Sequence, residues 1–316
     1  MSSDTSMRAV VQRSLGEPDV LEVVDTPRPK PRTNEVLVRV KAASVNPTDW
    51  KHRENGGFLG EPPFVLGWDL SGVVEEVGIG VARFRPGDEV FGMLSYPFGH
   101  GAHADYVAAP ASWFAPKPES LDHVQAAALP LVSLTAWQAL VEYADVQPGQ
   151  RVLVHAAAGG VGHVAVQIAK ARGAYVIGTA SAAKHDFLRE LGADEVVDYR
   201  DRDVEEIAHD VDAVLDTLGG DTSTRSLHTL RPGGIVVSLL PVGSGDFYRE
   251  ADELGVRAVR MLVDSSRHEL LSITDLVEQG ALRATIAEVF GLDQAAEAHR
   301  RGETGRTTGK LVLTTD

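Results

Sequence analysis

The stretch Val152-Leu153-Val154-His155-Ala156-Ala157-Ala158-Gly159-Gly160-Val161-Gly162 decides how this chain folds. Its apolar start, followed by small residues and glycines, is typical of a buried strand, a tight turn and the first turn of a helix. Ala157 stands where the usual G-x-G-x-x-G pattern has its first glycine, whereas Gly159 and Gly162 keep the two positions that need least bulk. Backbone N–H groups at such a helix start bind phosphate, so the stretch predicts a dinucleotide site. The alternative is a glycine-rich turn with a structural role alone.

Strands and helices alternate around this turn. After the glycines, apolar residues recur at helical spacing at Val161, Val164, Ala165 and Ile168. Strands are expected at residues 175–179, 195–197, 213–216 and 235–239, and helices at 133–143, 182–191, 204–209 and 221–229. This order predicts an α/β fold with a doubly wound parallel sheet.

The residues before about 130 have a different character. Short apolar or alternating segments at 8–13, 36–42, 72–77 and 89–92 lie between turn signals, and only residues 122–128 suggest a short helix. This pattern predicts a compact, irregular β-barrel. A helix at 273–279 is expected to return the chain to it, where 309–313 form a last strand. The predicted domains are therefore 1–130 with 265–316, and 131–264.

Composition narrows the classes of function. The chain has 316 residues, of which 43% are hydrophobic, so two domains with their own cores are expected. It contains no Cys, which excludes disulfides, a thiolate nucleophile and Cys-ligated metals. The net charge of −15 opposes binding to nucleic acid and to anionic membranes. A polar N-terminus and the lack of a long apolar run predict a soluble, cytoplasmic protein.

The residues after the second strand predict which dinucleotide binds. NAD sites usually carry an acid there, about 20 residues past the glycines, but this chain has Ala180. A hydroxyl and a cation, Ser181 and Lys184, follow and suit a 2′-phosphate, so NADPH is the expected cofactor. The alternative is that Ser181 caps the next helix and Lys184 is merely solvated.

Several motifs occur in order along nearly the whole chain, at residues 45–49 (VNPTD), 67–74 (GWDLSGVV), 85–90 (RPGDEV), 134–137 (LTAW), 155–162, 191–194, 216–219 and 305–313. Together they resemble the zinc-free, quinone oxidoreductase-like branch of the medium-chain dehydrogenase/reductase superfamily. It implies a GroES-like barrel beside a Rossmann domain, with the active site in the cleft between them.

The positions at which this chain differs from the zinc alcohol dehydrogenases of that superfamily are as informative as the matching motifs. Asn46 stands where they have a Cys ligand, and Trp68 follows Gly67 where they have a His ligand. Neither an amide nor an indole replaces those ligands well, so no metal is expected and alcohol oxidation is disfavoured. His100 and His103 form the one close His pair, and two loop histidines are favoured over a metal site.

The resemblance also implies roles for single residues. Asn46 and Thr135 match positions that touch the nicotinamide end. The matched positions at the pyrophosphate are Gly159, Gly160 and Val161, and those at the 2′-phosphate are Ser181, Lys184 and Tyr199. Leu240 and Val242 (within 240–243) flank the nicotinamide, Leu218 is a further cofactor-binding residue, and Arg306 and Lys310 lie near the cofactor. Tyr96 is a candidate proton donor. The alternatives are a turn residue for Asn46, a helix-start hydroxyl for Thr135, and packing for Tyr96 and Tyr199.

The predicted function is NADPH-dependent hydride transfer to a quinone or an activated alkene such as an enone, because such acceptors need mainly positioning in a closed site. An enoyl-thioester reductase and a cofactor-binding protein without turnover remain alternatives. A homodimer is also expected. The apolar strand at 235–239, followed by Gly243-Ser244-Gly245, is predicted to be the edge of the sheet. The resemblance implies that this edge pairs with its two-fold mate.

Overall fold

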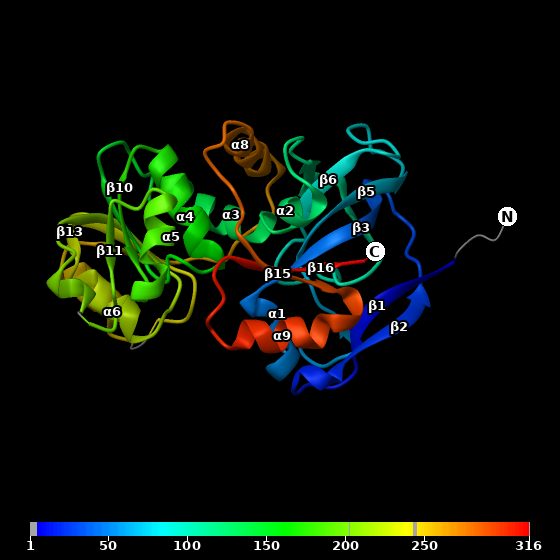
Figure 1. The fold of residues 1–316 in the computed structure, drawn as a ribbon, viewed down its shortest axis with the longest axis horizontal. Helices are drawn as coiled ribbons and strands as arrows, with labels where there is room; N and C mark the ends of the chain where they lie inside the picture. Colours follow the sequence, from blue (N-terminus) through cyan, green and yellow to red (C-terminus); the bar gives the residue numbers. More distant parts are fainter. Residues whose placement is uncertain (1–4, 202, 243–244, 316) are drawn as a thin grey trace. The chain divides into compact units, whose positions relative to one another are not determined.

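The computed structural model of the chain describes residues 5–201, 203–242 and 245–315. The chain divides into two compact units (Figure 1). The first comprises Met1–Leu131, Asp264–Glu278 and Ala284–Asp316, and the second comprises Val132–Val263 and Gln279–Arg283. Residues 279–283 were expected in the first domain. They lie with the second unit because the Gln167 side chain exchanges two hydrogen bonds of 3.0 Å with the backbone of Arg283.

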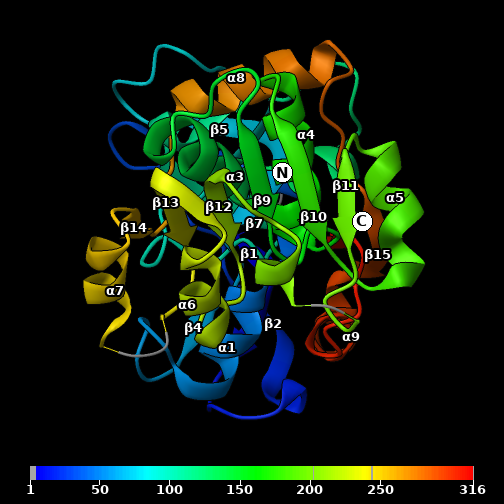
Figure 2. The ribbon, with the colours of Figure 1, turned by 90° about the vertical axis from the view of Figure 1, so that its left-hand side faces the viewer.

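The second unit is built on a parallel sheet. Among the described residues six strands pair in the order β11-β10-β9-β12-β13-β14 (Figure 2). Their bounds are β9 Arg151–Val154, β10 Tyr175–Thr179, β11 Glu195–Val197, β12 Val211–Asp216, β13 Leu230–Ser238 and β14 Arg257–Arg260. Leu153, Val214 and Val236 on neighbouring strands are fully buried, as expected where both faces of a parallel sheet are covered. The predicted α/β fold is confirmed.

The helices of this unit differ from the expected ones in length. They are α3 Pro130–Trp137, α4 Gly160–Ala171, α5 His185–Glu190, α6 Asp221–Leu227 and α7 Phe247–Glu253. The helix expected at 133–143 begins earlier and continues as a π-helix, Gln138–Tyr143. The helix expected at 204–209 is only a 3-10 turn, Val204–Glu206, because Asp210 already adopts a positive φ of 53° before β12.

Strand β14 corrects the expected dimer edge. Residues 235–239 were expected to be the last strand of the sheet, but β13 pairs along residues Ile235 to Ser238 with β14 on one side and with β12 on the other. The apolar strand is therefore interior, and β14 is the edge. Gly243 and Ser244, which the dimer and nicotinamide predictions included, lie outside the described residues.

The first unit is the barrel-like domain. In the described part of the chain, one sheet runs β15-β16-β3-β5-β6-β8, with β7 also paired to β3, and a smaller sheet runs β2-β1-β4. Their bounds are β1 Ser6–Gln12, β2 Leu21–Pro27, β3 Glu35–Val45, β4 Phe64–Val65, β5 Asp69–Val77, β6 Glu89–Met93, β7 Tyr106–Pro110, β8 Phe114–Pro116, β15 Ile286–Gly291 and β16 Lys310–Thr314. The C-terminal strand β16 lies antiparallel to β3, which closes this unit around its buried core.

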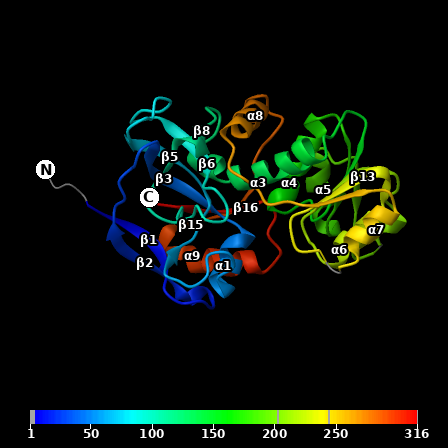
Figure 3. The same cartoon turned by 180° about the vertical axis from the view of Figure 1, so that it is seen from behind.

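Helices of the first unit are α1 Pro47–Asn55, α2 His123–Ala127, α8 Arg267–Glu278 and α9 Ala295–Glu303. The expectation of strands with only one short helix before residue 130 missed α1. Asn46 precedes it, Pro47 starts it, and Gly56 ends it with a positive φ of 76°. Helices α1 and α9 lie side by side (Figure 3), and a Cβ on Gly302 would come within 2.5 Å of the Trp50 ring.

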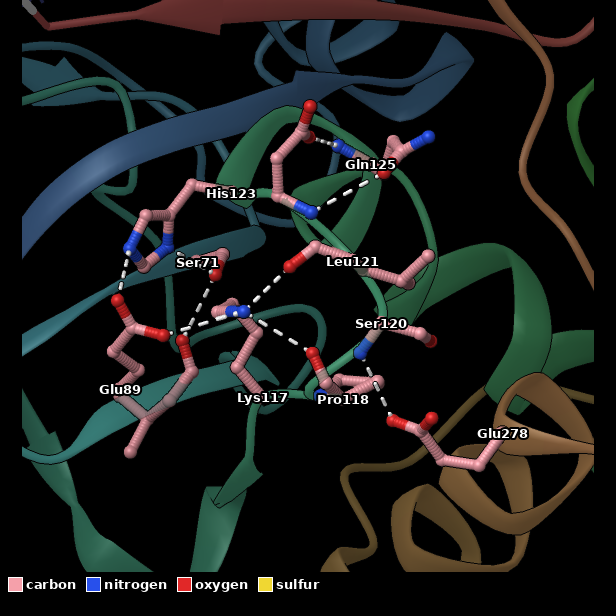
Figure 4. A network of polar contacts seen from close by, with 11 residues as sticks. Ser71, Glu89, Lys117, Pro118, Ser120, Leu121, His123, Gln125 and Glu278 are labelled. Atoms are coloured by element: carbon pink, nitrogen blue, oxygen red, sulfur yellow. Dashed lines mark hydrogen bonds and ion pairs between the residues drawn. The ribbon is translucent and has the colours of Figure 1, made fainter.

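A polar network holds the segment that leads into α2 (Figure 4). Lys117 Nζ is 3.2 Å from Glu89 and donates to the carbonyls of Pro118 and Leu121. His123 contacts Ser71 Oγ at 2.8 Å and Glu89 at 3.4 Å. These contacts tie the end of the barrel to the chain that enters the second unit. Within the described residues, no helix is both long and apolar enough to cross a membrane.

Candidate active site

The turn between β9 and α4 is shaped for a phosphate group. Gly159 precedes α4 with an extended backbone, and Gly160 and Val161 are its first residues, so their N–H groups face the helix start. A Cβ on Gly162 would lie 2.4 Å from the carbonyl oxygen of Ala156, so only glycine fits there. The first turn of α4 carries no acidic residue to repel an anion. The three predicted pyrophosphate residues therefore lie together on a turn that fits the group.

The residues expected beside the nicotinamide are also brought together. Buried Asp216, at the end of β12, accepts the N–H groups of Leu218 at 2.9 Å and Gly219 at 3.1 Å and the hydroxyl of Ser238 at 2.9 Å. Ser238 in turn donates to the carbonyl of Leu240 at 3.2 Å. Asp216 therefore holds the ends of β12 and β13 in one arrangement.

Val242 joins the same group of loops. Its backbone forms a bridge with Gly220, whose N–H donates to Pro241 at 2.9 Å. A Cβ on Gly219 would lie 2.8 Å from Leu240 Cβ, so the two loops are in close contact. Leu218 is half exposed. The expected residues Leu218, Leu240 and Val242 thus lie at the carboxyl edge of the parallel sheet, where ligands bind in such folds.

The expected 2′-phosphate residues lie around the end of β10, with an acid that the sequence analysis missed. Ser181 precedes a short 3-10 turn, Ala182–Lys184, whose last residue is Lys184, and Tyr199 is 57% exposed after β11. Asp198 accepts the N–H of Ala182 at 2.7 Å, and its backbone hydrogen bonds lower its pKa. Arg200 stacks on the Tyr199 ring at 5.4 Å. Asp198 could have been found in the sequence from its position at the end of β11. The carboxyl ends of parallel strands meet at one edge of the sheet, so a residue after β11 lies near the residues that follow β10.

Asn46 is the centre of a buried polar network in the first unit. Its Nδ2 donates to Asp69 Oδ1 at 3.1 Å and to Ser44 Oγ at 3.3 Å, and Lys310 Nζ donates to its Oδ1. Lysine only donates and a carboxylate only accepts, so the orientation of this amide is fixed. Asn46 and Lys310 are 1% and 3% exposed, and burial lowers the pKa of Lys310. The two predicted residues are joined directly.

Asp49, in the first turn of α1, is a further buried acid that the sequence analysis missed. Its carboxylate accepts the N–H of Asn46 at 2.6 Å and that of Gly67 at 2.8 Å. Burial raises the pKa of Asp49 to about 7, against the lowering effect of these hydrogen bonds. Its signal was the helix start at Asn46-Pro47, which places Asp49 at a capping position.

The remaining candidates fall in different places. Tyr96 is half-buried, and its hydroxyl accepts a hydrogen bond of 3.2 Å from Thr48, two residues after Asn46. Thr135 is 5% exposed within α3 of the second unit. Arg306 is exposed between α9 and β16, whereas Lys310 is buried. Lys310 is therefore hydrogen-bonded directly to Asn46. Tyr96 is linked to Asn46 only through Thr48, which lies in the first turn of α1.

The His pair is held by backbone carbonyls. His100 Nδ1 is 2.7 Å from the carbonyl oxygen of Val65, and His103 Nε2 is 3.3 Å from that of Ser44. Burial lowers the pKa of His103 to about 4. Across the described ranges, no three His, Asp or Glu side chains are grouped as metal ligands.

Comparisons with known proteins show the family to which both parts of the chain are related. Residues 32–119 match the alcohol dehydrogenase GroES-like domain, and residues 191–313 match a family described as zinc-binding dehydrogenase. A 2-haloacrylate reductase from a Burkholderia species is 36% identical over 97% of this chain and 98% of its own. The quinone oxidoreductase of Coxiella burnetii is 40% identical with a TM-score of 0.93, over 98% of this chain and 100% of its own.

The chain belongs to the quinone oxidoreductase-like branch of the medium-chain dehydrogenase/reductase superfamily. The Escherichia coli quinone oxidoreductase, solved in complex with NADPH, is 30% identical with a TM-score of 0.90, over 98% of this chain and 100% of its own. Membership of this superfamily makes the chain an oxidoreductase and confirms the resemblance drawn from its motifs. Asn46 and Trp68 occupy the two positions at which the sequence analysis compared this chain with the Cys and His ligands of zinc alcohol dehydrogenases.

Proposed function

We propose that this NAD(P)H-dependent oxidoreductase uses NADPH to reduce an electron-poor C=C bond or a quinone, without a metal ion. The nicotinamide supplies the hydride when the cofactor is bound. The α4 turn holds the pyrophosphate through backbone N–H groups, and the loops with Leu218, Leu240 and Val242 border the nicotinamide. The kinship with a 2-haloacrylate reductase and with quinone oxidoreductases supports an electron-poor acceptor.

The proposed direction of the reaction is supported by one observation, which is that both ring nitrogens of His52 in α1 are already hydrogen-bonded. His52 has its Nε2 occupied by the N–H of Phe58 at 3.2 Å and its Nδ1 by the carbonyl of Thr48 at 2.8 Å. Neither ring nitrogen is therefore placed to accept a proton from an alcohol. Alcohol oxidation needs such a base or a metal at the hydroxyl, whereas reduction of a quinone or enone does not.

NADPH is proposed over NADH because Lys184 and Arg200 bring two cations to the region of Ser181 and Tyr199. A 2′-phosphate interacts more strongly with such cations than a hydroxyl does. Asp198 opposes this preference, since its carboxylate occupies the Ala182 N–H and repels an anion. We take the two cations to outweigh the single acid.

The residues of the first unit orient the reacting groups in this proposal. Asn46 is held rigidly by Asp69 and Lys310, which suits a residue that positions the nicotinamide by contact. Thr135 is proposed for the same end of the cofactor. Tyr96 is the proposed proton donor to the enolate that forms when an enone accepts the hydride.

Stopped-flow oxidation of NADPH against benzoquinone, an enone and an enoyl-CoA tests the proposal. Rapid reaction with benzoquinone or the enone, and no reduction of NADP⁺ by a secondary alcohol, is the expected result. Reaction with the enoyl-CoA alone would favour an enoyl-thioester reductase. Tight NADPH binding without turnover on any acceptor would make the chain a cofactor-binding protein instead.

A further inference from the structure

Tyr96 lies in a compact cluster at the first turns of α1. The cluster consists of Thr48, His52, Phe58, Trp68 and Tyr96, and we call it the Tyr96 cluster. The Tyr96 ring lies 5.5 Å from the Trp68 ring, 6.0 Å from Phe58 and 6.1 Å from His52, measured between centroids. Trp68 is fully buried and donates its ring N–H to the carbonyl of Pro97 at 3.1 Å. Packing therefore fixes the plane of the Tyr96 ring.

The hydrogen bonds of the cluster have one consistent direction. The N–H of Phe58 can only donate, so His52 Nε2 is an acceptor and the ring proton of neutral His52 is on Nδ1. Burial lowers the pKa of His52, which keeps it neutral near pH 7. Nδ1–H donates to the Thr48 carbonyl at 2.8 Å and lies 3.1 Å from Thr48 Oγ. The Thr48 hydroxyl hydrogen is then directed to Tyr96, whose oxygen accepts it at 3.2 Å.

From this arrangement we infer that Thr48 is a positioning residue that makes Tyr96 a proton donor to the α-carbon of an α,β-unsaturated carbonyl acceptor. The inference rests on the proposed function and narrows its acceptor to enones and related compounds. Asn46 and Thr48 belong to the same helical turn, so Tyr96 is anchored to the turn that carries the proposed nicotinamide contact.

The chemistry of the two acceptor classes differs after hydride addition. Hydride at the β-carbon of an enone leaves an enolate, and its α-carbon accepts a proton slowly unless an acid is positioned there. Hydride addition to a quinone leaves an oxyanion that water protonates rapidly. A phenol held by packing and by Thr48 accelerates protonation of the enolate at its α-carbon, and it adds little to protonation of the oxyanion left by a quinone.

The proposed proton transfer is balanced in atoms and electrons. The Tyr96 O–H bond breaks, a C–H bond forms at the α-carbon, and the electron pair of the O–H bond stays on the Tyr96 oxygen. The Thr48 hydroxyl stabilises that phenolate by donating to it, since a hydrogen bond to the charged form favours it. His52 cannot replace the proton, because losing its single ring proton would leave an imidazole anion. Water returns the proton to Tyr96, which is half-buried rather than closed off.

Matched variants test this inference. Turnover would be measured for wild type, Tyr96→Phe, Thr48→Val and Thr48→Ser with cyclohexenone and with benzoquinone. Tyr96→Phe is expected to lower turnover of cyclohexenone about a hundredfold or more and to leave benzoquinone within about threefold. Thr48→Val should lower cyclohexenone turnover about tenfold, while Thr48→Ser, which keeps the hydroxyl, stays near wild type.

A second measurement needs neither cofactor nor turnover. Tyrosinate absorbance is titrated in wild type and in Tyr96→Phe, and the difference is the titration of Tyr96. Thr48→Val should move that midpoint to higher pH, and Thr48→Ser should not. His52 belongs to the cluster and burial lowers its pKa further below that of a phenol, so it does not obscure the midpoint. The ring of His100 contacts the cluster through Trp68.

The possible outcomes distinguish failure of this inference from failure of the proposed function. If wild type reduces both acceptors but Tyr96→Phe slows both equally, or slows neither, Tyr96 is not an enone-specific donor and the inference is wrong. An unchanged Tyr96 midpoint in Thr48→Val would exclude the role of Thr48. If wild type oxidises NADPH with neither acceptor, the proposed function itself fails, and the inference falls with it.

Discussion

At the adenosine end of the proposed cofactor site, Asp198 and Lys184 carry opposite charges, so we expect them to have opposite effects on the binding of a 2′-phosphate. Lys184 and Ser181 follow β10 in the sequence, so their local position was enough to find them. Asp198 follows β11 and reaches the same turn only because β10 and β11 pair in parallel through residues 177–179 and 195–197. An acid near the 2′ position can therefore come from the neighbouring strand, which a search at fixed spacing does not examine.

The first prediction concerns cofactor choice. Lys184→Ala is expected to weaken NADPH binding by about tenfold to a hundredfold and to change NADH little, because it removes a charge-assisted contact. Asp198→Asn should strengthen NADPH relative to NADH, because it removes a negative charge beside the phosphate. Fluorescence titration with both cofactors measures this. Equal affinities of the wild type for NADPH and NADH would refute the preference.

The second prediction concerns pH and Asp49. Its pKa is about 7 in the folded chain, against 3.8 for an aspartate in water, so the folded state keeps a proton that the unfolded chain has lost. The stability from this proton is fully present below about pH 4 and is lost as the pH rises through 7. The total loss is on the order of 4 kcal/mol.

Chemical unfolding of wild type and Asp49→Asn between pH 4 and about 8.5 checks this. Asparagine does not titrate, so the difference in unfolding free energy between the two proteins should change across that range. A constant difference would mean that Asp49 stays ionised in the fold.

At the scale of elements, hydrophobic pattern predicted α4 and the strands from β9 to β13, but it missed several strands of the first unit, the edge strand β14 and the helices α1, α7 and α9. The buried side of α1 carries Asp49, His52 and Arg53, whose polar atoms bond to backbone and to neighbouring side chains. Periodicity of apolar residues cannot detect a helix whose buried face is polar. Asn46, Pro47 and Gly56 at its ends were the available signals.

The third prediction separates the two glycine roles in the turn before α4. Gly162→Ala should destabilise the fold by roughly 1–3 kcal/mol, because its Cβ would meet backbone atoms of Ala156 and Ala157 at 2.4–2.7 Å. Gly159→Ala has an allowed backbone conformation and a nearest contact of 3.2 Å, so stability should change little. NADPH binding should weaken in both. Thermal melts and cofactor titration measure the two effects, and equal melting temperatures for the two variants would contradict the assignment.

At the scale of the whole molecule, the contacts of Asn46 and Trp68 bear on whether the protein can bind a metal ion at these two positions. Asn46 is engaged with Asp69, Ser44 and Lys310, and Trp68 is buried in the Tyr96 cluster. An amide held by an ammonium group is poorly placed to bind a cation.

The fourth prediction is that quinone or enone reduction survives exhaustive chelation. Activity before and after dialysis against a strong chelator is compared with elemental analysis of the same samples. One zinc ion per chain, with activity lost on its removal and restored on its return, would show that the enzyme depends on a metal.

The fifth prediction concerns assembly, and it follows from the correction at β14. We expect a homodimer in which β14 pairs with its mate, since β14 is the edge next to β13. A proline at Ala258 should then favour the monomer, while a proline in an exposed loop should not. Light scattering at micromolar concentration is the measurement. A wild-type monomer would exclude the dimer.

The sequence by itself determined the α/β fold, the phosphate turn and the branch of the superfamily, because these depend on glycines, apolar runs and motifs that are local along the chain. Tertiary structure alone decided which polar residues meet. Lys310 reaches Asn46 across 264 residues, Asp198 reaches Ala182 across 16, and Tyr96 reaches Thr48 across 48. Strand pairing and burial set these contacts, and the same burial raises the pKa of Asp49 and lowers that of Lys310. Neither strand pairing nor burial between residues far apart in the chain can be deduced from a local sequence pattern.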